Sequence, residues 1–201
     1  ANDLFPLAYG RFLVDDAKRI HEVEALDSPW DLDAPEPALK ILTITPDVDP
    51  QHASPRSIRI GSPVGEVRIP VRPWRKLLLS ISANLKRHDP DLILTHWGDT
   101  WLFPRLLQVC EEEGIGYFNP NRDQSRSVLH RGENSYFTYG QVVYRGGQYH
   151  LYGRWHIDQR NAMMFAEYGL AGVLEQARVT GLPVQEIARK SPGAGVTAMQ
   201  M

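Results

Sequence analysis

The sequence predicts a domain of mixed α and β structure, and three observations support this prediction. A short apolar run, ALKILTI, has the length and composition of a buried strand at residues 38–44. Apolar residues then recur at helical spacing over residues 74–85. A later stretch, residues 135–158, is rich in Tyr, Val and Phe around Gly146–Gly147, a pattern typical of a two-residue β-hairpin.

The remaining elements follow in chain order. The first 37 residues combine short apolar and charged groups with DSPWDLDAPEP, and we interpret them as an N-terminal arm and linker. After the first strand, SIRIGSPVGEVRIPV predicts two strands joined by a turn at SPVG. The helix that begins at Trp74 is expected to end near His88, and DPDLILTHW supplies the next strand. Pro104 fits the first turn of a second helix, which Gly114 is expected to terminate.

The C-terminal part predicts helices. Asp158 or Asn161 is expected to cap a long helix. One face of this helix is expected to be lined by Ala166, Leu170, Leu174 and Ala177. After Pro183, VQEIARK predicts a short last helix.

Composition limits the classes of function. The net charge of −2 gives no overall attraction to nucleic acid, so a DNA contact requires a local basic patch. No apolar run approaches the roughly 18 residues of a membrane span, and a cytoplasmic location is the default expectation. The sequence has neither zinc-ligand spacing, nor a phosphate-binding loop, nor a G-x-S-x-G nucleophile motif.

The segment DPDLILTHWGDTWLFPRLL, residues 89–107, resembles the second exonuclease motif of family B DNA polymerases. That motif has the form D-P-D-(I/L)-I-x-G-(H/Y)-N-x-x-x-F-D-x-P-x-L. The residues that fall in register without a gap are Asp91, Ile93, His96, Pro104 and Leu106. Trp97 stands in place of the family's Asn, Trp101 in place of its aromatic residue, and Leu102 in place of its metal-binding Asp.

Two further segments resemble the other exonuclease motifs, in the same order along the chain. ALKILTITPD resembles the first motif, with Thr45 in place of the family's Asp and Asp47 in place of its Glu. LEQARVTGLP resembles the sequence that follows the third motif, which places Phe165 at the family's Tyr and Gly169 at its Asp.

The resemblance implies an RNase H-like exonuclease fold, with a mixed sheet of about five strands flanked by helices and an additional β-hairpin. It divides the chain into the arm at 1–37, an exonuclease-like domain at 38–190, and a truncated linker at 191–201 toward an absent polymerase domain. The implied function is a non-catalytic domain with a structural or DNA-binding role in replication or repair.

The loss of catalysis is inferred from the metal chemistry. Cleavage with two metal ions needs several carboxylates, because Mg²⁺ and Mn²⁺ prefer hard oxygen ligands. Only Asp47 keeps a carboxylate among the matching positions. We therefore expect no catalytic residue, no metal and no cofactor.

Two alternatives remain open. An active, divergent nuclease would use Mg²⁺ or Mn²⁺ on acids in a shifted register: Asp47, Asp49, Asp99, Asp158 and Glu167. The simpler interpretation of Asp47, Asp49 and Asp99 is that they belong to turns or helix caps. The second alternative is a protein-interaction module that no longer binds nucleic acid.

The expected partners are single-stranded or primer-template DNA and a polymerase domain in the same chain. The candidate DNA-contacting residues are Trp97, Trp101, Arg105, Arg122, Arg126 and Arg131. Packing is the favoured role of Trp101, whereas packing and base stacking are equally compatible with Trp97. Solvation of an ordinary surface is the commoner role of scattered arginines.

Overall fold

A computed structural model describes residues 4–115, 118–138, 141–191 and 193. These residues form two compact units. One unit is continuous, Leu39–Asn161, and the other joins Ala1–Ala38 to Ala162–Met201. Residues 162–190, which the sequence analysis included in the exonuclease-like domain, therefore group with the N-terminal segment.

A five-stranded mixed sheet organises the unit Leu39–Asn161, in the order β11-β6-β3-β4-β5. The strands are β3 (Ile41–Pro46), β4 (Ser57–Ser62), β5 (Gly65–Pro70), β6 (Leu92–Thr95) and β11 (Trp155–Asp158). Strands β3, β6 and β11 are parallel, whereas β4 and β5 are antiparallel neighbours. The predicted fold class is confirmed, as is the hairpin at SPVG.

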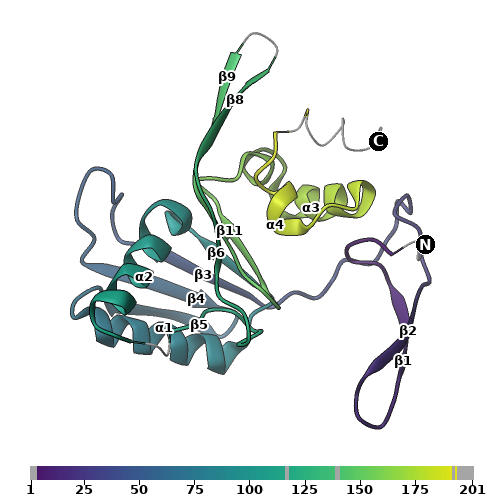
Figure 1. The fold of residues 1–201 in the computed structure, drawn as a ribbon, viewed down its shortest axis with the longest axis horizontal. Coiled ribbons are helices and arrows are strands. Elements are labelled where there is room, and N and C mark those ends of the chain that lie inside the picture. The colour runs from purple at the N-terminus through teal and green to yellow at the C-terminus, as the bar shows by residue number, and fades with distance from the viewer. Residues whose placement is uncertain (1–3, 116–117, 139–140, 192, 194–201) are drawn as a thin grey trace. The chain divides into compact units, whose positions relative to one another are not determined.

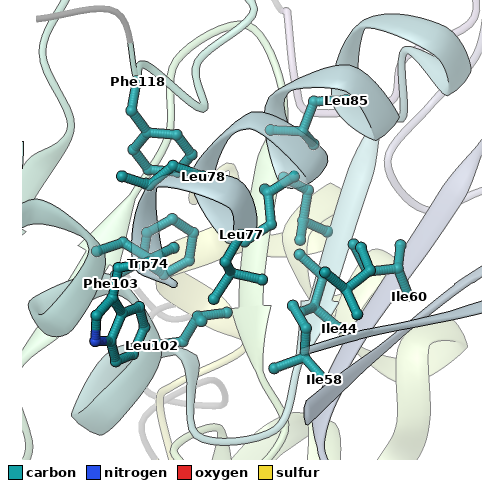
Figure 2. Close-up of a cluster of buried hydrophobic side chains, with 14 of the residues drawn as sticks. Ile44, Ile58, Ile60, Trp74, Leu77, Leu78, Leu85, Leu102, Phe103 and Phe118 are labelled. Atoms are coloured by element: carbon teal, nitrogen blue, oxygen red, sulfur yellow. The ribbon is translucent and has the colours of Figure 1, made fainter. Parts of the chain in front are cut away.

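Helices α1 (Trp74–His88) and α2 (Phe103–Glu112) cover one face of this sheet (Figure 1). The residues of α1 that the periodicity placed inside are buried, namely Trp74, Leu77, Leu78, Ile81 and Leu85. Alternate residues of β3 and β4 face them, including Ile44, Ile58 and Ile60. All of these side chains belong to one apolar cluster, and Figure 2 shows Ile44, Ile58, Leu77 and Leu78 among them. Both helices therefore form because each contributes an apolar stripe to a common core.

The prediction of a two-residue turn at Gly146–Gly147 was wrong, because these glycines lie within a longer β-ribbon. Strands β7 (Leu129–Arg131) and β10 (Gln148–His150) form its base, and β8 (Asn134–Thr138) and β9 (Gln141–Arg145) continue it. Arg131 pairs with Gln148 and Asn134 with Arg145, so the two glycines lie opposite residues 132–133, in the middle of the ribbon. The last pair of the ribbon is Thr138 with Gln141, and residues 139–140 lie outside the described residues. Figure 1 shows the ribbon extending beyond the sheet.

The second unit contains a hairpin within the segment predicted as an arm, together with the two predicted C-terminal helices. Strands β1 (Gly10–Val14) and β2 (Ile20–Ala25) form an antiparallel hairpin. Helices α3 (Met163–Thr180) and α4 (Val184–Ile187) belong to the same unit. The buried Arg178 joins the two sequence regions, because its guanidinium donates to Asp27 at 3.0 Å and to the carbonyls of Leu7 and Ser28 at 3.2 and 2.7 Å.

Helix α3 differs from its prediction at two points. Its N-cap is Ala162, without a side-chain cap, so the prediction that Asp158 or Asn161 caps it was wrong. Gly169 (φ 65°, ψ −168°) interrupts the helix and changes its phase, which explains why Ala177 is buried while Ala166 is exposed. The short helix after Pro183 is present as α4. The predicted linker 191–201 lies outside the described residues except for 191 and 193. No helix in the described part of the chain is long and apolar enough to span a membrane.

Candidate functional site

The carboxyl ends of the three parallel strands define the candidate site. Because β3, β6 and β11 run in the same direction, the segments that follow them lie at one edge of the sheet. These segments are 45–49, 96–102 and 158–161. Ligands of open α/β sheets bind at such an edge. The residues that match the first two exonuclease motifs lie in these segments.

Leu102 lies in the hydrophobic core. It ends a π-helical turn, Gly98–Leu102, that leads from β6 directly into α2. Its side chain is 1% exposed. Figure 2 shows it in the same apolar cluster as Leu77 and Ile58. The position that resembles the family's metal-binding Asp is therefore occupied by a core side chain.

Thr45 and Asp47 lie where β3 ends. Thr45 is half-buried and pairs with Arg59 of β4. The Asp47 carboxylate accepts hydrogen bonds from the Arg56 N–H at 3.1 Å, the Ser57 hydroxyl at 2.9 Å and the Arg68 guanidinium at 3.3 Å. Burial alone would raise the pKa of Asp47, but these hydrogen bonds outweigh it and the pKa is lowered. The only retained acid thus joins β3 to β4 and β5.

Two of the acids proposed for a shifted register, Asp99 and Asp158, are buried in one polar network. Asp158 accepts the N–H groups of Trp97 at 3.0 Å, Asp99 at 2.9 Å and Arg160 at 3.1 Å. Asp99 accepts the Tyr149 N–H at 2.8 Å and the Asn161 side-chain amide at 2.9 Å. The two carboxylates therefore hold the turn after β6 against β10 and the end of β11.

His156 is the centre of this network, and sequence reasoning missed it. Its Nδ1 lies 2.7 Å from the Tyr149 carbonyl, which only accepts, so in the neutral ring Nδ1 carries the proton. Nε2 then accepts from the Thr95 hydroxyl at 2.8 Å. Asp99 Oδ1 lies 3.6 Å from Nδ1. The one signal in the sequence was the pair of strands that each end in a polar residue, Thr95 and Asp158.

Gly98 is required by this packing. A Cβ at Gly98 would overlap the Thr95 hydroxyl and lie 2.6 Å from His156 Nε2. The preceding residue, Trp97, has a positive φ of 64°, which is unusual for a bulky side chain. Asp158 stabilises this backbone by accepting the Trp97 N–H. Strained backbone held by its surroundings is frequent at functional sites.

The two tryptophans of the segment have different environments. Trp97 is partly exposed, and the Arg160 guanidinium lies over its ring, 5.4 Å from the centroid. Trp101 packs against the hydrophobic core, with its ring centroid 6.4 Å from that of Trp74. Trp97 and Arg160 together form a partly exposed aromatic and cationic surface at the strand ends, which we call the Trp97 surface.

Asp49 lies at the same edge, in the turn after β3. Its carboxylate accepts the Gln51 N–H at 2.8 Å and lies 3.0 Å from His52 Nδ1. Burial raises the pKa of Asp49, but these hydrogen bonds and the positive charges of His52 and Arg160 lower it overall. The Arg160 guanidinium therefore contacts an indole ring and also acts electrostatically on the Asp49 carboxylate.

The candidate arginines mostly have intramolecular partners. Arg122 donates to the carboxylates of Asp89 and Asp91, both at 2.9 Å, and to three carbonyls. Asp91 in turn accepts the Lys40 N–H at 3.0 Å, so this motif residue joins the start of β6 to β3. Arg126 lies 3.5 Å from Asp123 and over the Tyr152 ring. Arg105 donates to Gln108 at 2.7 Å, and Arg131 is exposed on the ribbon.

The residues that match the third motif belong to the other unit. Phe165 lies in the first turn of α3, and Gly169 is its non-helical residue. Glu167, one of the acids of the shifted register, lies between them in the same helix. Gly169 has a left-handed φ and no atom within 4 Å of the position of a Cβ.

The residues at the sheet edge do not fit a pair of divalent ions. Among the residues that the structure describes, no group of three or more His, Cys, Asp or Glu side chains has a geometry suited to a metal ion. Asp47 is occupied by donors, and Leu102 is an apolar core residue. No reaction step through metal ions follows from this arrangement.

Comparisons with known proteins inform the fold. No protein-family model and no curated protein matches this sequence. The structure is similar to that of a family B DNA polymerase from the hyperthermophilic archaeon Pyrobaculum calidifontis, with a TM-score of 0.59 and 15% sequence identity. The match covers 96% of this chain and 32% of that polymerase chain. At this identity the likeness concerns the fold alone, and this chain spans about a third of the polymerase's length.

Proposed function

We propose that this chain is an exonuclease-like domain of a family B DNA polymerase-like protein, and that its nuclease site has been replaced by packing. Its role would be structural support and single-stranded DNA binding in replication or repair, beside a polymerase domain in the same protein. The observation that carries the proposal is the burial of Leu102 in the core, at the position that resembles the family's acid. The structural likeness to a family B polymerase supports the fold part of the proposal.

The absence of cleavage follows from the ligands that would be needed. Two Mg²⁺ or Mn²⁺ ions require several carboxylate oxygens directed at a common centre. Thr45 offers a hydroxyl, Leu102 offers no ligand, and Asp47 already accepts three hydrogen bonds. The acids of the shifted register, Asp99 and Asp158, accept backbone N–H groups inside the fold. These contacts favour a structural role for both carboxylates over the divergent-nuclease alternative.

The Trp97 surface is the part of the site suited to an unpaired base. An indole ring stacks on any base, and the Arg160 guanidinium adds a charge that attracts phosphate. The backbone at Trp97 is fixed by Asp158 and by the turn at Gly98, so the ring loses little freedom when a base binds. Trp101 has no such role, because its ring packs on the core.

The test is a binding and integrity assay on the full chain. Anisotropy of a short, labelled single strand measures affinity, and a gel measures its length after incubation with millimolar Mg²⁺ or Mn²⁺. We expect salt-dependent binding without shortening. Trp97→Asn removes the ring while suiting the left-handed backbone, and should weaken binding by about 1–3 kcal/mol, roughly 5- to 150-fold. Trp30→Asn is the control, because Trp30 is 63% exposed and lies in the other unit.

The outcomes separate the hypotheses. Shortening of the strand that disappears in Asp47→Ala would support the active nuclease and contradict our proposal. Binding that is equally weakened by Trp97→Asn and Trp30→Asn would exclude the Trp97 surface. An intact strand without any salt-dependent binding would favour the protein-interaction module.

A further inference from the structure

The outer face of α1 is strongly basic. Its exposed residues are Arg75, Lys76, Leu79, Ala83, Lys86 and Arg87. The exposed Arg72 precedes the helix, and WRKLLLSISANLKRH contains no acidic residue. We call Arg72, Arg75, Lys76, Lys86 and Arg87 the α1 basic face. It stands out in a chain whose net charge is −2.

The cations of the α1 basic face lack carboxylate partners. Over the described ranges of the chain, none of its members forms an ion pair, whereas Arg11 lies 3.4 Å from Glu24 and Arg19 lies 2.9 Å from Asp15. Arg72 does contact an aromatic ring, with its guanidinium 5.5 Å from the centroid of Trp74. The positive potential of this face is therefore not neutralised locally.

The position of two of these cations opposes the stability of the helix. Arg75 and Lys76 lie in the first turn of α1, where no acidic residue is present. The N-terminal end of a helix carries a partial positive charge, so cations there are unfavourable. Lys86 and Arg87 in the last turn suit the dipole, but Arg75 and Lys76 gain nothing from it. A residue choice that breaks a local rule without a compensating contact points to a function.

We propose that the α1 basic face binds the phosphate backbone of duplex DNA. The helical rise places the pairs Arg75–Lys76 and Lys86–Arg87 about 16 Å apart on a rigid element. A duplex presents about one negative charge per 1.7 Å of its axis, so both pairs can contact phosphates of one regular duplex. This proposal is independent of the Trp97 surface.

The face suits a duplex better than a single strand. Binding of unpaired strands relies on aromatic side chains for base stacking. None of the exposed residues of α1 is aromatic, because its one aromatic residue, Trp74, is buried in the core. Contacts to phosphates alone carry no sequence information, so binding should be independent of sequence and strongly dependent on salt.

The experiment measures the affinity of the full chain for a labelled duplex between about 50 and 200 mM salt. The variant Arg75→Gln with Lys76→Gln should reduce the slope of log K against log salt by about 1.8, since each phosphate contact contributes about 0.9. This corresponds to a loss of up to about 60-fold in affinity near 0.1 M salt. Glutamine has a helix propensity close to that of Lys and Arg, so the helix is kept.

Two controls make the result decisive. Arg11→Gln with Arg19→Gln removes the same charge from paired arginines of the β1–β2 hairpin and should leave duplex affinity nearly unchanged. The melting temperature of Arg75→Gln with Lys76→Gln should stay equal or rise, because the helix dipole is relieved. Lys86→Gln with Arg87→Gln should weaken duplex binding similarly.

The proposal is overturned if a folded Arg75→Gln, Lys76→Gln variant keeps the parent's affinity and salt slope. Equal losses in the paired-arginine control would also overturn it, since net charge would then explain binding. A failure of the Trp97 surface alone is recognised separately, because Trp97→Asn should change binding of single strands and leave duplex binding intact.

Discussion

Leu102→Asp places at this position the residue type that the resemblance to family B polymerases implies there. If the site has been replaced by packing, this carboxylate enters the cluster formed by α1, α2 and the sheet (Figure 2). Leu102 is 1% exposed, so the substitution acts on a fully buried position. We therefore expect a large loss of stability and no gain of nuclease activity.

The magnitude follows from two contributions. Removing a buried leucine side chain costs about 2–5 kcal/mol in lost transfer energy and cavity formation. Burial that raises the pKa of this Asp by about 3 units costs about 4 kcal/mol more at neutral pH, because the carboxyl ionises freely only in the unfolded chain. The sum, about 6–9 kcal/mol, is comparable with the entire stability of an ordinary domain, about 5–15 kcal/mol.

Urea unfolding of the full chain, followed by tryptophan fluorescence, measures the effect of Leu102→Asp. Leu102→Asn has nearly the shape of Leu102→Asp but cannot ionise. The difference in free energy of unfolding between the two variants should grow as pH rises above about 4, because the Asp ionises in the unfolded chain while burial opposes its ionisation in the folded one. Val64→Asp is the matched control, since Val64 is 79% exposed in the β4–β5 turn, and should change stability by no more than about 0.5 kcal/mol. A Leu102→Asp protein as stable as the parent, and further stabilised by Mn²⁺, would refute the reasoning.

Three other substitutions test the contacts around the site. Asp47→Asn should reduce the loss of stability in acid. Burial raises the pKa of Asp47, but hydrogen bonds to its carboxylate lower the pKa by more than burial raises it. The stability that the ionised Asp47 contributes is therefore present above about pH 4 and is lost as pH falls through the folded pKa. Melting temperatures between pH 2 and 7 check this, and an unchanged acid limb would contradict it. Arg122→Gln should cost about 2–4 kcal/mol, because it removes one donor from each of two carboxylates and the side-chain donor of three carbonyls, whereas Arg126→Gln, at an exposed pair, should cost less than about 1 kcal/mol in the same urea titration. Gly98→Ala should destabilise the chain by more than about 2 kcal/mol, because its Cβ would overlap a β6 hydroxyl, while Gly132→Ala meets open space and should be nearly neutral; equal unfolding midpoints for the two would exclude the proposed close packing at Gly98.

Local patterns were enough to predict the elements that form the core. The spacing of apolar residues predicted α1 over residues 74–88, and the short apolar runs predicted β3 and β6, because each of these elements buries one continuous face. The apolar side chain of Leu102 also indicates a position in the core. A leucine followed by Pro104 at the start of an amphipathic helix is a core residue, and its burial agrees with that chemistry.

Long-range contacts explain what the sequence did not predict. The pair Gly146–Gly147 has the chemistry of a tight turn, but the pairing of β7 with β10 and of β8 with β9 places it within the ribbon. Asp158 has the chemistry of a helix cap, yet its partners Trp97 and Asp99 are about 60 residues away in sequence. The only sequence signal for His156 was that β6 and β11 each end in a polar residue, because its hydrogen bonds depend on Thr95 and Tyr149 from two other strands.

The central claim, that packing has replaced the metal site, is tested most directly by the melting temperature of the full chain with and without millimolar Mn²⁺. An ion that binds only the folded state stabilises it by RT ln(1 + [L]/Kd), which is about 2.7 kcal/mol at a hundredfold excess over Kd. We predict no shift, because Asp47 is occupied by donors from β4 and β5 and Leu102 offers no ligand. A rise of several degrees that is abolished in Asp47→Asn would contradict the account.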